Sequence, residues 1–263
     1  MLKKIREYYE DPRIKGIDYD TDDVINIHRT ILLEKKAMNN VFRYFYKRCF
    51  YLDNKYFSGK GTRIEIGGGV SFFNKIYPEV VITDIKKSDQ LDQVLDAQQM
   101  NLDNETVRAI YGINCFHHFP EPKKFFYELE RVLINGGGCI LIDPYYGFLS
   151  RRMYPNLSNI ESFDMTQEDW ENSESGVMNG ANQAKSYIVF KRDKKRFHEQ
   201  FPNLEIVYQK PLNNYLEYLL SGGLNFKQLC PEFLFPVVRL IEFILSPISS
   251  LFALHHIIVI RKK

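Results

Sequence analysis

The segment from Thr62 to Asp143 constrains the fold more than any other part of the sequence, because short β-type runs alternate there with helical ones. The β-type runs are RIEIG, VVITDI, QVLDA, AIYGIN and CILID, and an amphipathic run, FFYELERVLI, lies between the last two. Such alternation is typical of βαβ units, in which parallel strands form a sheet and helices cover its faces. The segment therefore predicts an α/β, Rossmann-like domain.

The remainder of the chain is predicted to surround this sheet. Residues 1–60 form an N-terminal helical cover, because apolar residues recur there at helical spacings. Residues 61–263 form the Rossmann-like domain, which two insertions interrupt. The polar, aromatic stretch at about 144–192 is long for a connection and indicates a functional lid. The second insertion, at about 212–254, is apolar and helical.

Three consecutive glycines follow the amphipathic run. Because glycine commonly ends helices and permits tight turns, they are predicted to end the helix and turn the chain into the next strand. These residues are Gly136, Gly137 and Gly138.

A second glycine-rich turn follows the first β-type run, which contains Glu65 and leads into Gly67, Gly68 and Gly69. Glycines there let the backbone bend sharply and approach a ligand closely, although an ordinary tight connection also explains them. Asp84 ends the next run, seventeen positions after Gly67, within the window where a carboxylate meets a ribose diol.

The third β-type run ends in an acidic and a small residue, Asp96 and Ala97. They fall at the edge of the sheet where an adenine ring would lie, and a simple Asx turn is the alternative interpretation. A nicotinamide dinucleotide normally requires GxGxxG, but the position three after Gly69 is Phe72. An NAD-dependent oxidoreductase is therefore disfavoured and stays as an alternative.

The order IEIGGG, TDI, LDA, INCFHHF and RVLINGGGCILIDP resembles class I S-adenosylmethionine-dependent methyltransferases across roughly residues 60–145. The resemblance implies a seven-stranded, mostly parallel sheet with helices on both faces, whose final strand, HHIIVIRKK, is antiparallel. It also implies an S-adenosylmethionine cofactor and methyltransferase activity. A non-catalytic S-adenosylmethionine-binding protein is the other alternative.

In that family the cofactor lies across the strand ends, and the resemblance carries its contacts onto this sequence. Glu65 would steady the methionine end, the loop Gly67 to Gly69 would pass under the cofactor, and Asp84 would bind the ribose. Asp96 and Ala97 would meet the adenine, while Asn114 and Cys115 would lie beside the methionine portion. One departure is Ser71, which replaces the third glycine of the family's motif.

Phrases beyond this core are similar to a bacterial subgroup of these enzymes that is often linked with polysaccharide or glycolipid synthesis. They are HRTILLEKK, ANQAKSYIVFKRD, FPNLEIV and YLLSGG. We therefore expect O-methylation of a small-molecule, sugar or glycolipid-type acceptor.

Methyl transfer to a hydroxyl benefits from a base, and histidine is the usual one. His117 and His118 follow the fourth strand at the carboxyl edge of the sheet, where open α/β folds place their sites. Asp143, after CILID, lies on the same edge and is predicted to orient the base or bind the acceptor. The competing interpretation makes the histidines a helix cap and a solvated side chain, and Asp143 a turn residue.

Several further side chains are weaker candidates. Tyr145 and Tyr146 follow Asp143 and line the pocket unless they serve packing alone. A polar group within the lid could clamp an anionic or sugar-like acceptor, although a solvated loop is more common: Asn179, Asn182, Lys185, Arg192 and Asp193.

Charge and cysteine content restrict the partners. Thirty-five Lys and Arg against thirty-three Asp and Glu leave a formal charge of +2, too small for a general attraction to nucleic acid. The four cysteines form no CxxC pair, so we expect reduced thiols and no metal site. The charged N-terminus has no apolar core typical of a signal peptide, which favours a cytoplasmic location.

Residues 231–254 are apolar but are interrupted by Pro236, Arg239, Glu242 and Pro247. A membrane-spanning helix requires about 20 predominantly apolar residues, so we do not expect this stretch to cross a bilayer. The favoured prediction is an amphipathic cap packed on the sheet. The alternative is a peripheral membrane contact that reaches a lipid-linked acceptor.

Overall fold

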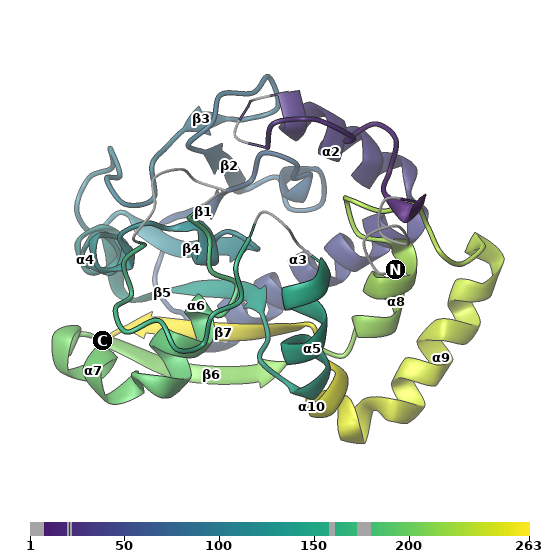
Figure 1. Cartoon of the computed structure of the whole chain (residues 1–263). Coiled ribbons are helices and arrows are strands. Elements are labelled where there is room, and N and C mark those ends of the chain that lie inside the picture. The colour runs from purple at the N-terminus through teal and green to yellow at the C-terminus, as the bar shows by residue number, and fades with distance from the viewer. Residues whose placement is uncertain (1–7, 20, 22, 158–160, 173–179) are drawn as a thin grey trace.

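The structure is a computed structural model that describes residues 8–19, 21, 23–157, 161–172 and 180–263. Seven strands form one sheet in the order β3-β2-β1-β4-β5-β7-β6 (Figure 1). Strands β1 to β5 run parallel, and β7 pairs antiparallel with both β5 and β6. The strands are β1 (Thr62–Ile66), β2 (Val80–Asp84), β3 (Gln93–Val94), β4 (Val107–Ile113), β5 (Leu133–Pro144), β6 (Leu204–Pro211) and β7 (His255–Lys262). The predicted Rossmann-like, seven-stranded architecture is confirmed.

Helices cover both faces of this sheet. The α-helices are α2 (Asp23–Glu34), α3 (Lys36–Tyr56), α4 (Pro122–Val132), α5 (Phe148–Leu157), α6 (Lys185–Tyr187), α7 (Lys194–Gln200), α8 (Tyr215–Ser221), α9 (Phe235–Leu245) and α10 (Ser249–Phe252). Shorter 3-10 or π-helical turns are η1 (Phe73–Lys75), η2 (Phe116–His118), η3 (Ile188–Arg192), η4 (Glu232–Leu234) and η5 (Ser246–Ile248).

The central strands are buried on both faces, as the alternation along β7 shows. Ile258 and Ile260 pack into the core on the α4 and α7 side, whereas Ile257 and Val259 pack into the core on the α3 side. Successive residues of a strand point to opposite faces, so an uninterrupted apolar run is required where both faces are covered. The run IIVI meets that requirement.

The helix α4 follows directly from its sequence. Pro122 occupies its first turn, where a missing backbone N–H costs nothing. Phe125, Leu129 and Val132 repeat at helical spacing and are fully buried, while Arg131 pairs with Glu128 on the outside. Its amphipathic face therefore anchors it to the sheet.

The prediction that three consecutive glycines end the helix before β5 is wrong. Gly136, Gly137 and Gly138 lie inside β5 and do not end the helix, which stops at Val132. A Cβ on Gly138 would approach the Ile260 carbonyl oxygen to 2.2 Å and the Phe57 ring to 2.3 Å, so glycine is needed there for close packing. The run FFNKIY, between β1 and β2, contains the short turn η1.

The two predicted insertions, the lid and the apolar stretch, contact different parts of the fold. Part of the expected lid packs into the core through Trp170, Ile188 and Phe190, whereas Glu161 and Gln183 of the same stretch line the cavity described below. The favoured prediction for the apolar stretch, a cap packed on the sheet, is wrong. Its main helix, α9, lies at the outer edge of the molecule beside α8 (Figure 1). By length and composition, Glu232–Phe252 could cross a membrane, and 17% of its most apolar 18-residue window is buried.

Candidate active site

A cavity of about 950 Å³ opens at the carboxyl ends of the central strands. Six of the predicted site residues line it: Glu65, Gly67, Gly68, Asn114, His117 and His118. These residues follow β1 and β4, which are neighbours in the sheet. Parallel strands bring their carboxyl ends to one edge, so the chain order of the motifs assembles them in space.

The bend after β1 requires glycine for two separate reasons. Gly67 has a φ of +63°, in the left-handed region, and a Cβ there would lie 2.5 Å from the Cβ of Cys115. A Cβ on Gly68 would lie 2.7 Å from the Ile82 side chain. The backbone thus passes close to two neighbouring elements and leaves its cavity side bare of side chains.

Glu65 is buried beneath this bend and is held by Ser71. The Ser71 hydroxyl donates to Glu65 Oε2 at 2.5 Å and lies 2.9 Å from the Tyr46 hydroxyl. Burial raises the pKa of Glu65 to about 8, although the Ser71 hydrogen bond opposes the shift. Ser71, the departure from the family's glycine motif, therefore positions the carboxyl group.

Asp84 lies at the end of β2 and binds backbone amides on both sides. Its carboxylate accepts hydrogen bonds from the N–H groups of Gly69 at 2.9 Å and Lys86 at 2.9 Å. Burial raises the pKa of Asp84, and these hydrogen bonds act in the opposite direction. A carboxylate has about four acceptor positions, so two amide bonds leave capacity for ribose hydroxyls.

The helix α2 covers the glycine bend from the N-terminal side. Arg29 donates to the Ser71 carbonyl and, at 3.4 Å, to the Val70 carbonyl. A Cβ on Gly69 would meet Ile25 at 3.1 Å. His28 lines the cavity. A helix surface would normally expose a polar pair such as His28 and Arg29. Here His28 lines the cavity and Arg29 ties α2 to the glycine bend, so the pair helps to close this side of the site.

Asn114 has the strongest local signal for a bound ligand. It has a φ of +52°, rare for a residue other than glycine, and lines the cavity. Its Oδ1 is buried and, among the residues that the structure describes, has no hydrogen-bond partner. An amino group such as that of a methionine moiety would satisfy this oxygen. The bare glycine bend and this oxygen fit the methionine end of S-adenosylmethionine.

Several predicted cofactor residues lie outside the cavity lining. They are Gly69, Asp84, Asp96, Ala97 and Cys115. Asp96 Oδ1 accepts the Gln98 N–H at 2.8 Å, which is the Asx turn of the alternative interpretation. Ala97 is buried in the core, and Cys115 is buried beneath Gly67.

His117 and Asp143 form a buried pair at the ends of β4 and β5. His117 Nδ1 lies 2.8 Å from Asp143 Oδ1, and the two side chains are 4% and 0% exposed. Burial lowers the pKa of His117, but the charge and hydrogen bond of Asp143, with the charge of Glu161, outweigh it and raise the pKa overall. With Nδ1 held by Asp143, the other ring nitrogen, Nε2, can act as a base in the cavity.

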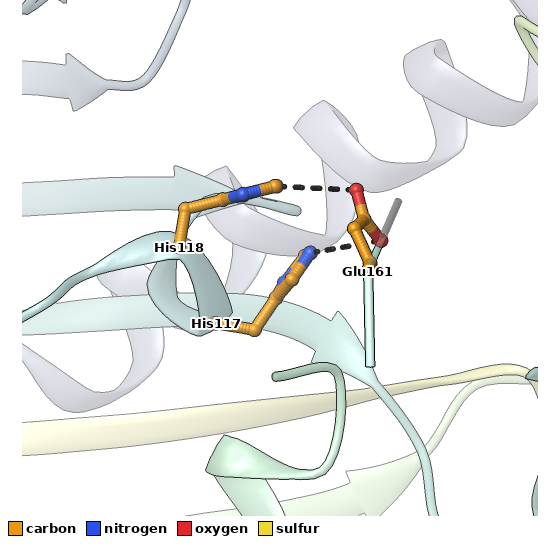
Figure 2. A group of neighbouring side chains, drawn as sticks. All are labelled: His117, His118 and Glu161. Carbon is orange, nitrogen blue, oxygen red and sulfur yellow. Dashed lines mark ion pairs between the residues drawn. The ribbon is translucent and has the colours of Figure 1, made fainter. Parts of the chain in front are cut away.

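Glu161, from the lid, faces both histidines (Figure 2). Its oxygens lie 3.8 Å from His117 Nε2 and 3.7 Å from His118 Nε2. Burial acts to raise the pKa of Glu161, but the two histidines outweigh it and lower the pKa. The three side chains are also close enough together to hold a divalent ion, an arrangement that the sequence did not predict.

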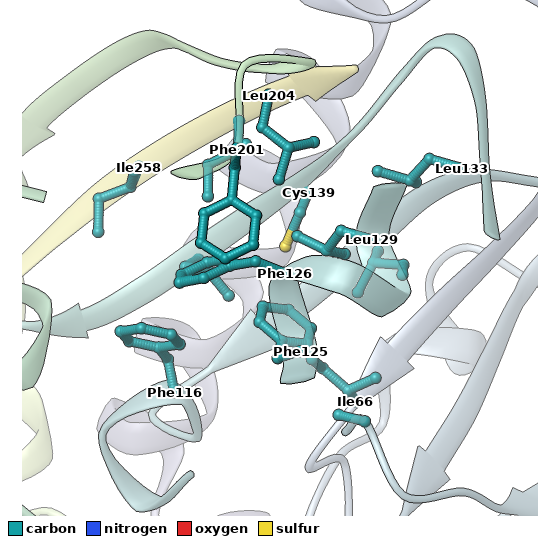
Figure 3. Packing of buried hydrophobic residues seen from close by; sticks show 14 of the residues in the cluster. Ile66, Phe116, Phe125, Phe126, Leu129, Leu133, Cys139, Phe201, Leu204 and Ile258 are labelled. Atoms are coloured by element: carbon teal, nitrogen blue, oxygen red, sulfur yellow. The ribbon is translucent and has the colours of Figure 1, made fainter. Parts of the chain in front are cut away.

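The turn η2, which carries the two histidines, is anchored by Phe116. This ring is fully buried between Phe126 and Phe190, with ring centroids 5.8 and 5.1 Å away. Figure 3 shows Phe116 beside Phe125 and Phe126 of α4. The aromatic core below the cavity therefore fixes the backbone from which His117 projects.

Most of the predicted polar clamp in the lid serves structure. Asn182 bonds the Asp164 backbone and Gln167, Lys185 donates to the Phe119 carbonyl and Asn172, and Arg192 pairs with Asp193. Burial lowers the pKa of Lys185 to about 7. Asn179 lies outside the described residues.

Tyr145 and Tyr146 pack against His256, with ring centroids 5.5 and 5.6 Å away, and are not among the cavity-lining residues. Conversely, sequence reasoning missed Glu161, Gln183 and His255 as lining residues. Glu161 and Gln183 belong to an irregular stretch whose path no periodicity indicates. His255 is the first residue of β7 and pairs with Pro144 at the end of β5, so the pairing of these two strands could have indicated its place at the cavity.

Comparison with known proteins supports the methyltransferase prediction. Residues 74–141 match the family model described as a methyltransferase domain, which covers 68 of the 263 residues. The match includes Asp84, Asn114 and both histidines and begins after the glycine bend. It confirms a methyltransferase domain in the centre of the chain. No curated protein matches the sequence.

Two solved structures illustrate the range of similar chains. One is phosphoethanolamine N-methyltransferase 2 of Haemonchus contortus in complex with S-adenosyl-L-methionine: 12% identity, TM-score 0.48, covering 95% of this chain and 61% of that chain. The other is geranyl diphosphate C-methyltransferase from Streptomyces coelicolor A3(2) in complex with Mg²⁺, geranyl diphosphate and S-adenosyl-L-homocysteine: 12% identity, TM-score 0.48, covering 100% of this chain and 88% of that chain.

Proposed function

We propose that this protein transfers the methyl group of S-adenosylmethionine to a hydroxyl oxygen of a small-molecule, sugar or glycolipid-type acceptor, with His117 as the base. The observation that carries the proposal is the joint position of the bare glycine bend, Asn114 and His117 on one cavity. A family match to a methyltransferase domain supports the same chemistry.

The cofactor would be held by residues at the ends of β1, β2 and β4. Gly67 and Gly68 would lie under it, Glu65 and Asn114 would bind its methionine portion, and Asp84 would bind the ribose. When bound, S-adenosylmethionine supplies an electrophilic methyl group on a positively charged sulfur.

His117 would accept the hydroxyl proton of the acceptor. The lone pair of the acceptor oxygen forms the new bond to carbon while the carbon–sulfur bond breaks, so its proton must leave. His117 Nε2 takes that proton, and Asp143 stabilises the resulting imidazolium from the other side of the ring. His118 and Glu161, which lie beside His117, would orient the acceptor.

The remaining wall of the cavity favours an acceptor with both polar and apolar parts. Gln183 lines the cavity, and its Oε1 is buried without a hydrogen-bond partner within the described part of the chain, so it could accept from a sugar hydroxyl. Leu219, Leu224 and Leu254 supply an apolar surface on the same cavity. This combination supports a glycolipid-type acceptor, in agreement with the resemblance to the polysaccharide- and glycolipid-linked subgroup.

The main alternative, an NAD-dependent oxidoreductase, is disfavoured by Phe72. Its ring is buried against Tyr46 with a centroid distance of 5.1 Å, at the position where a dinucleotide fingerprint needs glycine. Isothermal titration calorimetry of the full chain with S-adenosylhomocysteine and with NADH separates the two. We expect binding of the first and none of the second; binding of NADH alone would overturn the proposal.

A further inference from the structure

The segment Glu232–Phe252, which comprises η4, α9, η5 and α10, turns an apolar stripe toward the outside of the molecule. The exposed residues of this stripe recur at helical spacing: Phe233, Val237, Leu240, Ile241, Ile244, Ile248 and Leu251. Phe233 is 77% exposed and Ile244 is 64% exposed. A contiguous apolar surface of this kind is uncommon on a soluble monomer and marks an interaction site.

The opposite side of the same segment is the one that carries its charges. Glu242 is buried against α8, where it accepts hydrogen bonds from the backbone N–H groups of Leu216 at 2.5 Å and Glu217 at 3.2 Å. Arg239 bonds the Glu217 carboxylate at 2.9 Å. Phe235 and Val238 are buried beside these polar contacts and pack toward α3 and α8. The leucine and isoleucine side chains of α9 nevertheless face outward, unlike those of a helix that buries its whole apolar face on a soluble core.

The geometry suits a helix lying in a membrane surface better than one crossing it. The whole segment Glu232–Phe252 has 21 residues, which is enough to cross a membrane by length. Its longest regular part, α9, has 11 residues and is about 17 Å long at 1.5 Å per residue, roughly half of a hydrocarbon core of about 30 Å. Pro247 lies in the turn η5 that separates α9 from α10. Figure 1 shows α9 running along the edge of the molecule, outside α8, where a flat lipid surface can reach it.

Cations flank the apolar stripe on two sides. On the α3 side, Arg43 and Lys47 line a groove together with Phe243 of α9. On the α5 side, Arg151 and Arg152 are exposed, and the Arg152 guanidinium lies 3.9 Å from the centre of the Phe148 ring. Basic residues around an apolar helix face complement the negative headgroups of anionic lipids.

We propose that Glu232–Phe252 docks on a membrane that contains anionic lipids, with its apolar stripe between the acyl chains and the flanking cations at the headgroups. A second copy of the chain fits this surface less well, because a two-fold contact through the same stripe would bring the cations of both copies together. Docking goes beyond the proposed function, because it requires neither a bound methyl donor nor turnover of an acceptor.

The position of the cavity gives the docking a consequence. Leu229 precedes the segment and Leu254 follows it, and both line the cavity. Both ends of the docked segment therefore lead to the acceptor site, so a lipid-borne acceptor would enter from the membrane surface. This consequence rests on the proposed function, whereas the docking itself does not.

Sedimentation of the full chain with vesicles tests the docking. One vesicle preparation is phosphatidylcholine alone and the other is phosphatidylcholine mixed with phosphatidylglycerol. The test variant carries Phe233→Ser, Leu240→Ser and Ile244→Ser. The matched control carries Tyr51→Ser, Val94→Ser and Tyr127→Ser, which remove exposed apolar side chains elsewhere on the molecule.

We expect the wild type and the control to sediment with the mixed vesicles, and the test variant to lose binding by about tenfold or more. Arg43→Gln with Lys47→Gln and Arg151→Gln should weaken binding without touching the apolar stripe. Calorimetry with S-adenosylhomocysteine on every variant checks the fold separately, so a failure of docking is distinguishable from a failure of the proposed function.

Four results would overturn the docking. The first is that the wild type stays in the supernatant with both vesicle preparations. The second is that the apolar variant and the charge variant both sediment like the wild type. Light scattering shows a dimer that the apolar variant dissociates, without any vesicle binding. Vesicle-bound protein resists extraction at alkaline pH, which would indicate a spanning segment.

Discussion

The imidazole of His117 and the carboxylate of Asp143 meet at 2.8 Å, Nδ1 to Oδ1, in the buried space between the ends of β4 and β5. The two residues are 26 positions apart in the chain and come from strands that pair in parallel. Asp143 Oδ2 is buried and has no hydrogen-bond partner within the described residues, so the carboxylate serves chiefly the histidine. This pair is the basis of the proposed base catalysis.

Removing either member of the pair should slow the reaction without loss of the cofactor. We expect His117→Ala to lower kcat by roughly 10²–10⁴-fold, the usual contribution of a general base, with S-adenosylhomocysteine affinity unchanged. His118→Ala, the matched control on the same turn, should lower kcat less. Single-turnover assays with calorimetry measure both quantities, and wild-type rates in both variants would remove the histidine base.

Asp143→Asn should also change the pH dependence of the rate. The Asp143 charge and hydrogen bond raise the pKa of His117, so their loss lowers that pKa. Since the base must be unprotonated, the rising limb of kcat/KM against pH should move to lower pH in the variant, at a reduced maximum rate. An unshifted limb would mean that another group titrates there.

Asp84→Ala should weaken S-adenosylhomocysteine binding by about 1–3 kcal/mol, the cost of leaving ribose hydroxyls without their acceptor. The carboxylate also holds the Gly69 N–H, so part of this loss reflects a looser glycine bend. Asp84→Asn keeps one acceptor oxygen and should lose less. Calorimetry gives both values, and an unchanged affinity in Asp84→Ala would refute the ribose assignment.

Glu65 should make the free energy of unfolding fall as pH rises. Its pKa in the folded protein is raised from 4.5 to about 8, so the folded state binds the proton more tightly than the unfolded state. The resulting stability is fully present below about pH 4.5 and is lost as pH rises toward about 8, by up to about 1.4 kcal/mol per pH unit.

Glu65→Gln removes this titration, so the stability of the variant relative to wild type should increase between about pH 5 and pH 8. Urea unfolding of both proteins across that range measures the difference. A difference that stays constant with pH would contradict the raised pKa.

Metal ions should inhibit the enzyme, because a divalent ion held by His117, His118 and Glu161 would occupy the nitrogen that the base needs. We expect turnover to be unchanged by EDTA and lowered by added Zn²⁺, with His118→Ala relieving the inhibition. Loss of turnover in EDTA that a divalent metal restores would instead make this group a functional metal centre.

The sequence predicted those parts of the site that depend on strand order. Asp143 lies at the end of β5 and His117 follows β4, and a βαβ pattern makes these strands neighbours, so their shared edge could be inferred from the chain alone. Glu161 could not be predicted, because the stretch before it has no periodicity that fixes its path. The hydrogen bond from Ser71 to Glu65 depends on a side-chain direction that spacing does not give.

The apolar insertion shows the limit of reasoning from hydrophobicity. Its helical spacing is confirmed, but the prediction that it packs on the sheet is wrong: Phe235 and Val238 pack toward α3 and α8, and the other apolar side chains face outward. The buried acceptor Glu242 binds the amides at the start of α8, and this polar contact turns the leucine and isoleucine stripe outward. Which face of an amphipathic helix is buried depends on the element that it packs against. Here that element is α8, whose first backbone N–H groups need an acceptor and find it in Glu242.

The central claim is tested most directly by following label from methyl-radiolabelled S-adenosylmethionine into a fractionated bacterial extract. We predict that the wild-type chain labels an acceptor fraction, and that His117→Ala binds S-adenosylhomocysteine equally well and labels it at least about 10²-fold more slowly. Equal labelling by the two proteins would contradict the role of His117. Absence of labelling by the wild type, together with no S-adenosylhomocysteine binding, would contradict the methyl donor itself.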